Sequence, residues 1–432
     1  MDRRKFIKQS FMAGMAASQF RVNVLAGSKN KKYRTVLIGA GWWGNNILGE
    51  AMASGYCDIV GICDADEIFN METAARVEKD MGKLPKTYTD YRELLTEQKP
   101  EIAIIATPEH WHAVQTIDAL KTGCHVYMEK PIAHTINEGK AIVASQKKYG
   151  KVIQVGLHRR TSPHILVGQE MLRSGKVGEI KMIKACVYSP TANTIVQPLP
   201  APPPHLHWDL YLGPAAYQPF ESSVHPRGFR KYLNMTNGTI GDWGVHWMDQ
   251  ILWWSEEKYP KKVYSTGGMV DPDCGYDAPD FQTATLEFEN FTVNWEHRRL
   301  GGERSEKSPV GTYFYGTEGI LFMGFFDGAY FYPNDEDQPI VQVNHAMHEP
   351  DGQNIRELWK DFIDAIEGKK SPVAGIESSH RATTMSLLAM ISYKTGRQIN
   401  WDGEKEMILD DPEALSLMKR DYRAPWVYPE LS

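Results

Sequence analysis

Gly39-Ala40-Gly41-Trp42-Trp43-Gly44 is the stretch that decides the fold of this chain. It follows a short apolar run, residues 35–38, and precedes a stretch whose apolar residues recur at helical spacing. A strand, a glycine-rich turn and a helix in this order are the context that a dinucleotide-binding turn requires. Gly39 permits the tight turn, Gly41 lets the backbone approach a pyrophosphate, and Gly44 lets the helix pack against the strand. The helix then presents free N–H groups and the positive end of its dipole to the phosphates.

Asp64 is a second sign of nucleotide binding. A predicted strand over residues 59–63 ends at this acid, 20 residues after Gly44. A carboxylate there accepts hydrogen bonds from the ribose hydroxyls of NAD, and it would repel the 2′-phosphate of NADP. The sequence therefore predicts NAD rather than NADP, with Trp42 and Trp43 of the turn as further cofactor contacts. An ordinary βαβ unit with an acidic loop is the alternative interpretation.

Length, charge and cysteine content narrow the class of protein. The chain has 432 residues, enough for two domains with separate cores. Its net charge of -6 argues against a nucleic-acid partner. Its 5 cysteines are odd in number and form no C-x-x-C pair, so they are expected to be buried thiols and not disulfides.

The first 30 residues resemble an export signal. Arg3 and Arg4 precede a short, weakly apolar stretch over residues 11–20. We therefore expect residues 1–30 to be a twin-arginine signal and the protein to be periplasmic. The apolar part is too short to cross a bilayer, so no stable membrane span is expected. If the arginines belong to a basic tail instead, the protein would be cytoplasmic.

The order of predicted elements indicates an α/β protein with two folded domains. Residues 31–155 alternate strands and helices, as in an NAD-binding Rossmann domain with a doubly wound parallel sheet. Residues 156–432 are expected to form an α+β domain for substrate binding and oligomerisation, with a large open, mostly antiparallel sheet. Its C-terminal helix and tail are expected to pack back toward the first domain. The long strands of this second sheet are predicted at residues 180–188, 262–270, 281–296 and 312–315.

An irregular stretch over residues 189–241 separates the first two of these strands. It contains a proline run and 6 aromatic residues. A loop of this length is usually functional or disordered, and its aromatic content argues against disorder. We therefore predict that it forms one wall of a substrate cleft, with surface padding as the alternative.

Two predicted strand ends carry polar residues that would face the cofactor. Thr107, Pro108 and His112 follow one apolar strand directly, and Glu129 and Lys130 follow the next. The carboxyl ends of parallel strands line the cofactor crevice. The first four residues are therefore candidate cofactor contacts, and Lys130 is expected to point at the nicotinamide end. A solvated loop lysine is the alternative.

Asp242 and His246 form a third candidate group. They are four residues apart in a predicted helix and therefore share one face. A histidine with an ordinary pKa can move protons near neutral pH. Trp243, beside them, is a candidate substrate contact. The alternatives are a helix N-cap for Asp242 and a core position for His246.

Two pairs of histidines have a spacing that metal ligands can have. They are His110 with His112, and His205 with His207. Neither pair has an evident third ligand, so no metal site is predicted.

These segments together resemble the Gfo/Idh/MocA family, which includes glucose–fructose oxidoreductase and inositol dehydrogenase. The E-K-P tripeptide that begins at Glu129 and the D-x-x-x-H segment that begins at Asp242 carry the resemblance. Residues 155–160, Val-Gly-Leu-His-Arg-Arg, are similar to the segment that joins the two domains of that family. The resemblance runs from about Tyr33 to the C-terminus. The paired arginines at the start and Arg-Ala-Pro-Trp near the end resemble the exported bacterial branch.

The resemblance implies a role for each candidate residue. Lys130 would lie beside the reacting hydroxyl and lower its effective pKa or polarise the ketone. His246 would be the general base that takes the hydroxyl proton as hydride leaves for the nicotinamide. Asp242 would hydrogen-bond substrate or orient His246. His158 and Arg159 would reach the substrate from the domain junction.

The resemblance also implies a reaction, with alternatives. The expected function is hydride transfer between a tightly bound NAD and a secondary hydroxyl of a sugar or glycoside, with C3 as the expected carbon. Because the periplasm offers no known free NAD pool, a redox-neutral NAD-dependent glycosidase or lyase is the first alternative. It would oxidise, eliminate, add water and reduce through a keto-sugar. A non-catalytic sugar-binding protein on the same fold is the second. The broad second sheet predicts a homodimer or homotetramer.

Overall fold

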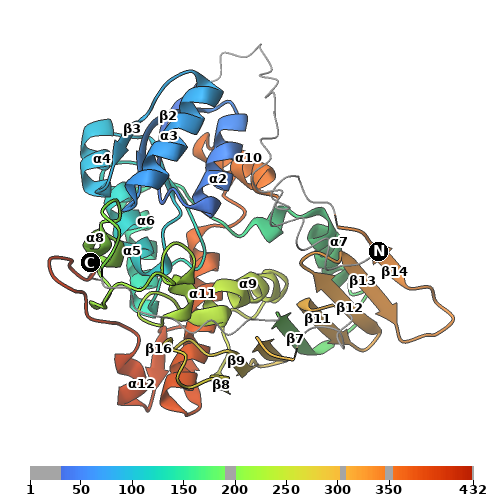
Figure 1. Ribbon diagram of the computed structural model, residues 1–432. Helices are drawn as coiled ribbons and strands as arrows, with labels where there is room; N and C mark the ends of the chain where they lie inside the picture. The colour runs from blue at the N-terminus through green and yellow to red at the C-terminus, as the bar shows by residue number, and fades with distance from the viewer. Residues whose placement is uncertain (1–30, 190–200, 302–307, 346–353, 431–432) are drawn as a thin grey trace.

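The computed structural model describes residues 31–189, 201–301, 308–345 and 354–430. Two sheets organise them, a parallel sheet near the N-terminus and a larger sheet in the second half of the chain (Figure 1). The predicted export signal, residues 1–30, lies outside the described residues. No helix of the described part is long and apolar enough to cross a bilayer. All five cysteines are buried free thiols, as predicted.

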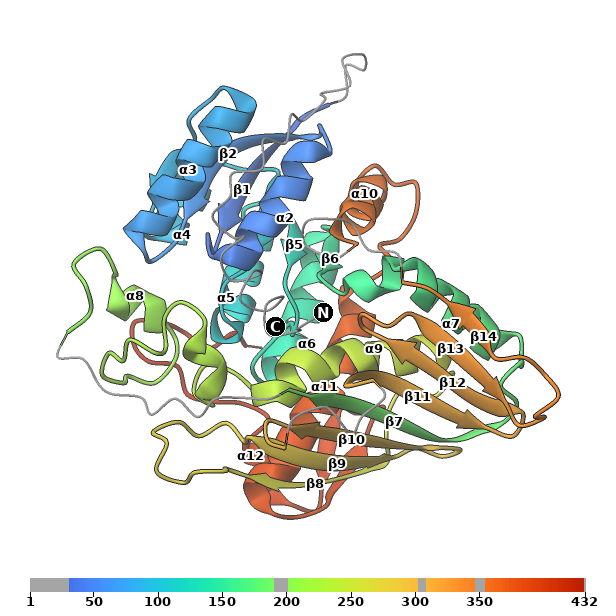
Figure 2. The same cartoon turned by 45° about the vertical axis from the view of Figure 1, so that its right-hand side comes forward.

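The first sheet is a doubly wound parallel sheet with the strand order β3-β2-β1-β4-β5-β6. The chain order reverses between β1 and β4, where a crevice opens at the carboxyl ends of the strands. Strand β4 is apolar and buried at every position, which suits a sheet that has helices on both faces (Figure 2). The strands are β1 Tyr33–Ile38, β2 Cys57–Cys63, β3 Lys86–Tyr88, β4 Ile102–Ile105, β5 His125–Met128 and β6 Ile153–Val155. The helices between them are α2 Trp42–Ala53, α3 Glu67–Met81, α4 Tyr91–Gln98, α5 Glu109–Lys121 and α6 Ile136–Tyr149.

Side-chain caps fix where several of these helices begin. The carboxylate of Asp66 accepts a hydrogen bond from the backbone of Ile68 at the start of α3. Thr135 and Glu138 form a capping box at the start of α6. Each cap satisfies backbone N–H groups that the first helical turn leaves without partners.

The second sheet has ten strands in the order β14-β13-β12-β11-β7-β10-β9-β8-β15-β16. Among the described strands of this sheet only β7 and β10 pair in parallel, so the sheet is mostly antiparallel, as predicted. The strands on one side of the parallel pair are β7 Ile180–Tyr188, β11 Val310–Gly316, β12 Gly319–Gly324, β13 Ala329–Pro333 and β14 Val341–Val343. Those on the other side are β10 Thr292–Arg298, β9 Phe281–Glu287, β8 Lys262–Gly268, β15 Ile399–Asp402 and β16 Met407–Leu409.

The single strand predicted over residues 281–296 was wrong. The chain forms a hairpin instead, with β9 and β10 on either side of a turn at Glu289 and Asn290. The backbone N–H groups of both turn residues donate to the carboxylate of Glu257. The aromatic rings of Phe288 and Phe291 stack with their centroids 4.4 Å apart and close the turn.

Helices fill the space between the two sheets. Helices α7 Pro163–Arg173, α9 Val245–Trp254 and α11 Ile376–Thr395 lie on the inner face of the second sheet (Figure 2). Helix α11 also contacts α6 of the first sheet. A buried ion pair joins Arg160 to Asp249 of α9, with a nitrogen–oxygen distance of 2.6 Å. The two sheets therefore share one helical layer.

Segments late in the chain return to the first sheet. Helix α10, Ile355–Ile366, packs on α2, and Arg356 of α10 pairs with Glu50. Beyond the short helix α12, Pro412–Ser416, the tail places Trp426 with its ring centroid 4.7 Å from that of Trp111. The tail thus lies beside the edge of the crevice.

Candidate functional site

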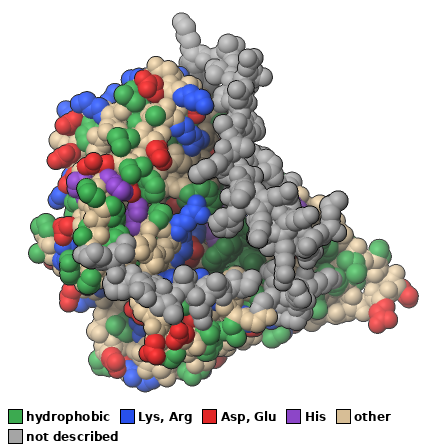
Figure 3. Space-filling view, in the orientation of Figure 1, with side chains coloured by type: hydrophobic (Ala, Val, Ile, Leu, Met, Phe, Trp, Pro, Cys, Tyr) green, Lys and Arg blue, Asp and Glu red, His purple; other side chains and the backbone are tan. Residues whose placement is uncertain are grey.

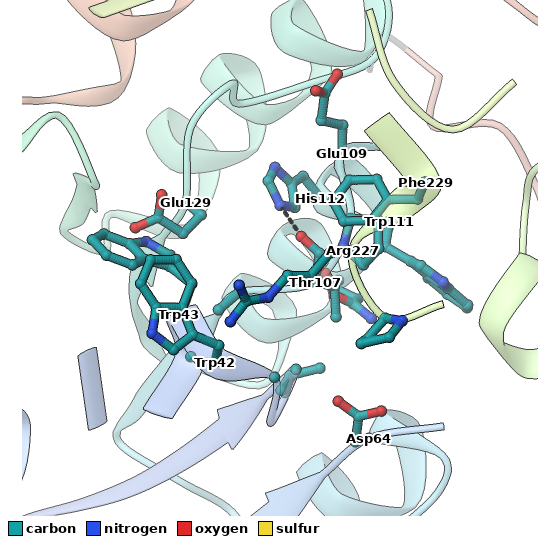
Figure 4. Close-up of a pocket in the computed structure, with 18 of the residues that line it drawn as sticks. Trp42, Trp43, Asp64, Thr107, Glu109, Trp111, His112, Glu129, Arg227 and Phe229 are labelled. Atoms are coloured by element: carbon teal, nitrogen blue, oxygen red, sulfur yellow. Dashed lines mark hydrogen bonds between the residues drawn. The ribbon is translucent and has the colours of Figure 1, made fainter. Parts of the chain in front are cut away.

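A cavity of about 820 Å³ lies where the first sheet, the second sheet and the long loop meet. The glycine-rich turn and the ends of β2, β4 and β5 line one side of it. Residues 210–230 of the long loop and the start of α9 line the other side. Figure 4 shows labelled side chains from both sides converging on this space. The loop therefore does form a wall of the cleft.

The glycines of the turn are required for different reasons. Gly39 has a φ of 95°, and a Cβ there would lie 2.6 Å from the backbone of Ala106. A Cβ on Gly44 would lie 2.0 Å from the carbonyl oxygen of Gly39, so helix α2 could not pack so closely. A Cβ on Gly41 would meet nothing within 4 Å. Gly41 therefore leaves open space beside the helix N-terminus, where a pyrophosphate fits.

Asp64 ties the end of β2 to the turn. Its carboxylate accepts hydrogen bonds from the backbone of Ala40 at 2.7 Å and of Asp66 at 2.9 Å. Burial raises the pKa of Asp64 to about 6. A carboxylate has about four acceptor positions, so two remain for ribose hydroxyls. Asp64 lines the cleft at the place that the sequence predicted.

The two tryptophans of the turn occupy different places. Trp42 is 57% exposed, and its ring centroid lies 5.2 Å from that of Trp43. Trp43 is half-buried, and its ring lies 5.9 Å from that of His158. Both line the cleft. Trp43 therefore connects the glycine-rich turn with the part of the cleft that holds the histidines.

Asp242 is the centre of a charged group in the cleft. Its carboxylate accepts hydrogen bonds from Lys130 Nζ at 2.6 Å and from Arg230 Nε at 2.9 Å. Lys130 also donates to the backbone carbonyl of Asp242 at 2.8 Å. Burial alone would raise the pKa of Asp242, but the charges of Arg230 and Lys130 outweigh it and hold the pKa below its usual range. Asp242 is therefore ionised at neutral pH.

The predicted geometry of Asp242 and His246 needs a correction. Asp242 lies in a π-helical turn, Ile240–Gly244, that precedes α9, and it does not cap the helix. Its carboxylate binds Lys130 and Arg230, and no hydrogen bond to His246 is found among the described residues. Both side chains line the cleft, with Asp242 in the π-helical turn and His246 in α9. Asp242 positions the lysine.

His246 is buried and neutral. Burial lowers the pKa of His246 well below its usual value, and the charge of Lys130 lowers it further. Its Nδ1 atom has no hydrogen-bond partner among the described residues. Its ring lies 5.1 Å from the ring of His158 between centroids. A neutral imidazole in this position can accept a proton.

Arg159 does not reach the cleft. Its side chain is fully buried, and the guanidinium lies 3.6 Å from the centroid of the Phe325 ring. Phe325 and Phe326, at the end of β12, line the cleft in its place. Arg159 supports that aromatic wall from behind, so it is not expected to touch a substrate. His158 and Trp243, in contrast, line the cleft.

Glu129 offers a buried acceptor in the cleft. Burial raises the pKa of its carboxyl group to about 7. Its Oε1 atom is buried and has no hydrogen-bond partner among the described residues. A Cβ on Gly156 would lie 2.2 Å from this oxygen, so the glycine makes room for the carboxyl group. Together with the open space at Gly41, this orphaned acceptor fits a bound dinucleotide.

The segment after β4 is held by its own hydrogen bonds. His112 contacts the carbonyl oxygens of Thr107 and Pro131, each at 2.7 Å, and so links two strand ends. The hydroxyl of Thr107 donates to Gln115 at 2.6 Å. Thr107, Pro108 and His112 all line the cleft. Both ring nitrogens of His112 contact backbone carbonyl oxygens, so this residue holds the wall of the cleft in place.

Neither pair of histidines forms a metal site in the described part of the chain. His110 contacts the carbonyl oxygen of Tyr211, and His207 pairs with Glu67 at 2.7 Å. Both contacts fasten the long loop to the first sheet.

Sequence reasoning missed several residues that line the cleft. They come from segments that are distant in the chain. One signal in the sequence pointed to some of them, the aromatic content of the long loop. The missed residues are Trp111, Tyr211, Arg227, Arg230, Phe325, Phe326 and Trp426.

We expect alanine at Gly41 and at Gly44 to have different effects. Gly44→Ala should lower the free energy of unfolding by about 1–3 kcal/mol because of the clash with Gly39. Gly41→Ala should leave the urea midpoint unchanged but weaken NADH binding at least about tenfold, since its Cβ enters the pyrophosphate space. Urea unfolding and NADH fluorescence titration measure the two effects. Wild-type NADH affinity in a stable Gly41→Ala protein would contradict the placement.

Two family models match the chain. One describes an oxidoreductase family with an NAD-binding Rossmann fold and matches residues 33–157. The other describes the C-terminal alpha/beta domain of that oxidoreductase family and matches residues 187–428. Together they cover most of the chain.

The chain is also similar to individual proteins. D-glucoside 3-dehydrogenase of Escherichia coli K12 is 22% identical over 385 residues, which cover 85% of this chain and 97% of that protein. Glycosyl hydrolase family 109 protein 1 of Akkermansia muciniphila is 31% identical over 156 residues, 35% of this chain and 32% of that protein.

A solved structure has the same fold. The WlbA dehydrogenase of Chromobacterium violaceum, in complex with NADH and UDP-GlcNAcA, superposes with a TM-score of 0.67 at 16% identity. The superposition covers 88% of this chain and 99% of that chain. With both family models matched in order, the chain belongs to the Gfo/Idh/MocA family of NAD-binding oxidoreductases.

Proposed function

We propose that this protein uses NAD to oxidise a secondary hydroxyl of a sugar or glycoside, with C3 as the carbon. The observation that carries the proposal is the ion pair between Lys130 and Asp242 at 2.6 Å, in the same cleft as the glycine-rich turn and His246. The pair places an ammonium group beside the space that a nicotinamide ring would face from the turn. The sugar is supported by the relatives, since one is a D-glucoside 3-dehydrogenase and another binds UDP-GlcNAcA.

Lys130 has one N–H free for the substrate. Its ammonium group has three donors, and two of them bond the carboxylate and the carbonyl oxygen of Asp242. The third can donate to the substrate hydroxyl and stabilise the negative charge that develops on that oxygen. Asp242 fixes the direction of this donor because it holds the other two.

His246 would accept the proton of the same hydroxyl. It is neutral because burial lowers its pKa, and the residue lines the cleft beside Lys130. NAD, when bound, supplies the nicotinamide carbon that accepts the hydride. The charge of Lys130 and the base at His246 thus act on one oxygen from two sides.

Aromatic side chains could hold the sugar. Trp243 and Phe325 meet edge to face with centroids 5.0 Å apart, and Phe326 is 52% exposed at the cleft. Aromatic rings present apolar faces that fit the C–H faces of a sugar. This wall stands beside His246, which would bring the ring hydroxyls close to the base.

A redox-neutral glycosidase is the second candidate. It is favoured by the 31% identity to a glycosyl hydrolase family 109 protein, although the match covers only 35% of this chain. In this cycle the enzyme would oxidise a ring hydroxyl, eliminate the glycosidic oxygen, add water and return the hydride.

Incubation with p-nitrophenyl glycosides, without added NAD, tests both candidates. Keto-sugar with NADH equal to the enzyme supports the dehydrogenase, whereas nitrophenol released over many turnovers supports the glycosidase. In either case Lys130→Met should lower the rate at least about 100-fold, because the donor to the substrate oxygen is lost. Full turnover by a folded Lys130→Met protein, or no reaction with any sugar, would instead favour a binding protein.

We also propose a homodimer formed through the outer face of the second sheet. No described helix covers this face at Met182, Tyr315, Ile320 and Tyr330, and Met182 is 41% exposed. Large apolar patches on a sheet favour association.

Sedimentation equilibrium should give twice the chain mass for the wild type, and the variant Met182→Glu with Tyr330→Glu should be a monomer. A monomeric wild type would exclude the dimer, and a fourfold mass would indicate the tetramer.

Charge on the visible face agrees with a small-molecule substrate. Acidic and basic side chains alternate over the described part of the face in Figure 3 and form no broad field of one sign. Such a surface gives no electrostatic footprint for a nucleic acid.

We also propose that the protein is exported to the periplasm by the twin-arginine pathway. It is supported by Arg3 and Arg4 and by the five unpaired thiols, which suit a protein that folds in a reducing compartment first. Fractionation of bacteria with a twin-arginine pathway should find the wild type in the periplasm. Replacement of both arginines by lysine should retain it in the cytoplasm. Equal distribution of the two proteins would contradict export by this route.

A further inference from the structure

Arg227 belongs to the long loop, yet its side chain lies beside the glycine-rich turn. We infer that Arg227 clamps the pyrophosphate of NAD against this turn and slows the release of the cofactor. The inference rests on the NAD site of the proposed function and not on the identity of the sugar. It gives a role to the part of the long loop that lines the cleft opposite the glycine-rich turn.

The position of the guanidinium carries the inference. Its central carbon lies 4.7 Å from the centroid of the Trp42 ring. In Figure 4 the side chain of Arg227 points toward Trp42 and Trp43 and away from Asp64. Trp42 lies in the first turn of α2, directly after Gly41. The cation therefore stands over the end of the helix that would receive the phosphates.

The turn has room for the phosphates and lacks a counter-charge of its own. A Cβ on Gly41 would meet nothing within 4 Å, and the N-cap of α2 makes no side-chain hydrogen bond. The first turn of α2 has neither an acidic nor a basic charge near its backbone donors. The N–H groups and the dipole alone would face two negative phosphates, so a nearby cation adds most of the charge compensation.

Of the lysines and arginines that line the cleft in the described part of the chain, Arg227 is the one that remains available for this purpose. Lys130 and Arg230 both bind Asp242, and Arg159 is buried behind Phe325. Among the described residues, Arg227 has a ring contact but no ion pair with a carboxylate. A planar guanidinium can stack on a tryptophan and still offer several N–H groups to phosphate oxygens.

The backbone that carries Arg227 is firmly attached to the first sheet. The ring of His225 stacks on Phe69 at 5.4 Å between centroids, and its Nε2 lies 3.6 Å from the carboxylate of Asp66. Phe229, two residues after Arg227, belongs to the buried apolar cluster of the loop. The loop is thus fixed on both sides of Arg227, and little ordering of the backbone would be needed for the clamp to form.

Release of NADH from the purified protein tests the inference. NADH fluorescence would be followed after mixing loaded protein with excess NAD, for the wild type and for Arg227→Gln. We expect the variant to release NADH about 10- to 100-fold faster, the range for a lost charge-assisted contact. Arg227→Lys should lie between the two, because it keeps the charge but loses stacking and the fork of donors.

Two controls separate the clamp from a displaced loop. Lys231→Gln removes a charge from the same loop, but Lys231 contacts the ring of Tyr276 and does not line the cleft, so its release rate should equal that of the wild type. Adenosine lacks phosphates, so its affinity should be the same for the wild type and for Arg227→Gln, whereas ADP-ribose should bind the variant more weakly.

The remaining outcomes separate a failure of the Arg227 clamp from a failure of the proposed NAD site. Equal NADH release from the wild type and Arg227→Gln would overturn the clamp and leave the NAD site intact. Equal weakening of adenosine and ADP-ribose would also overturn it, because the loss would then not come from the phosphates. A wild type that binds neither NADH, ADP-ribose nor adenosine would overturn the proposed function itself.

Discussion

The carboxylate of Asp242 is the contact on which the site depends. It accepts from Lys130 at the end of β5 and from Arg230 of the long loop, and it lies itself just before α9. Three segments of the chain thus meet at one charge. Without it, Lys130 and Arg230 would lose the carboxylate that both contact and would leave the poorly exposed ammonium group of Lys130 without a counter-charge, which is costly. The contacts of Lys130 with the carboxylate and the carbonyl oxygen of Asp242 fix the direction of the lysine donor.

Burial gives the ionisable groups around this contact different charges at one pH. Asp242 is ionised because two cations lower its pKa, whereas Glu129 has a pKa of about 7 because it is buried. His246 is neutral, since burial and the charge of Lys130 lower its pKa. Groups whose environments separate their pKa values in this way can divide the tasks of acid, base and electrostatic support. The cleft therefore provides a fixed cation and a neutral base beside each other.

The first sheet could be predicted closely because its signals are local. Strands β4 and β5 end just before Thr107 and Glu129, as predicted, since short apolar runs followed by polar residues indicate strands of a buried parallel sheet. The hairpin of β9 and β10 was missed because both strands alternate in the same way across a two-residue polar turn. What closes that turn is a stacked pair of phenylalanines and a carboxylate from residue 257, and neither contact is visible in a local pattern.

The sequence by itself determined the dinucleotide turn, the residues at the strand ends and the family. Each depends on neighbours in the chain and on backbone limits, such as the clash that a Cβ on Gly44 would cause. Only the tertiary structure decided which charges meet. It paired Asp242 with Lys130 and not with His246, moved Arg159 behind an aromatic wall and brought Arg227 to the turn. These contacts join residues over 100 positions apart, and their energies depend on burial and distance, which the order of residues does not contain.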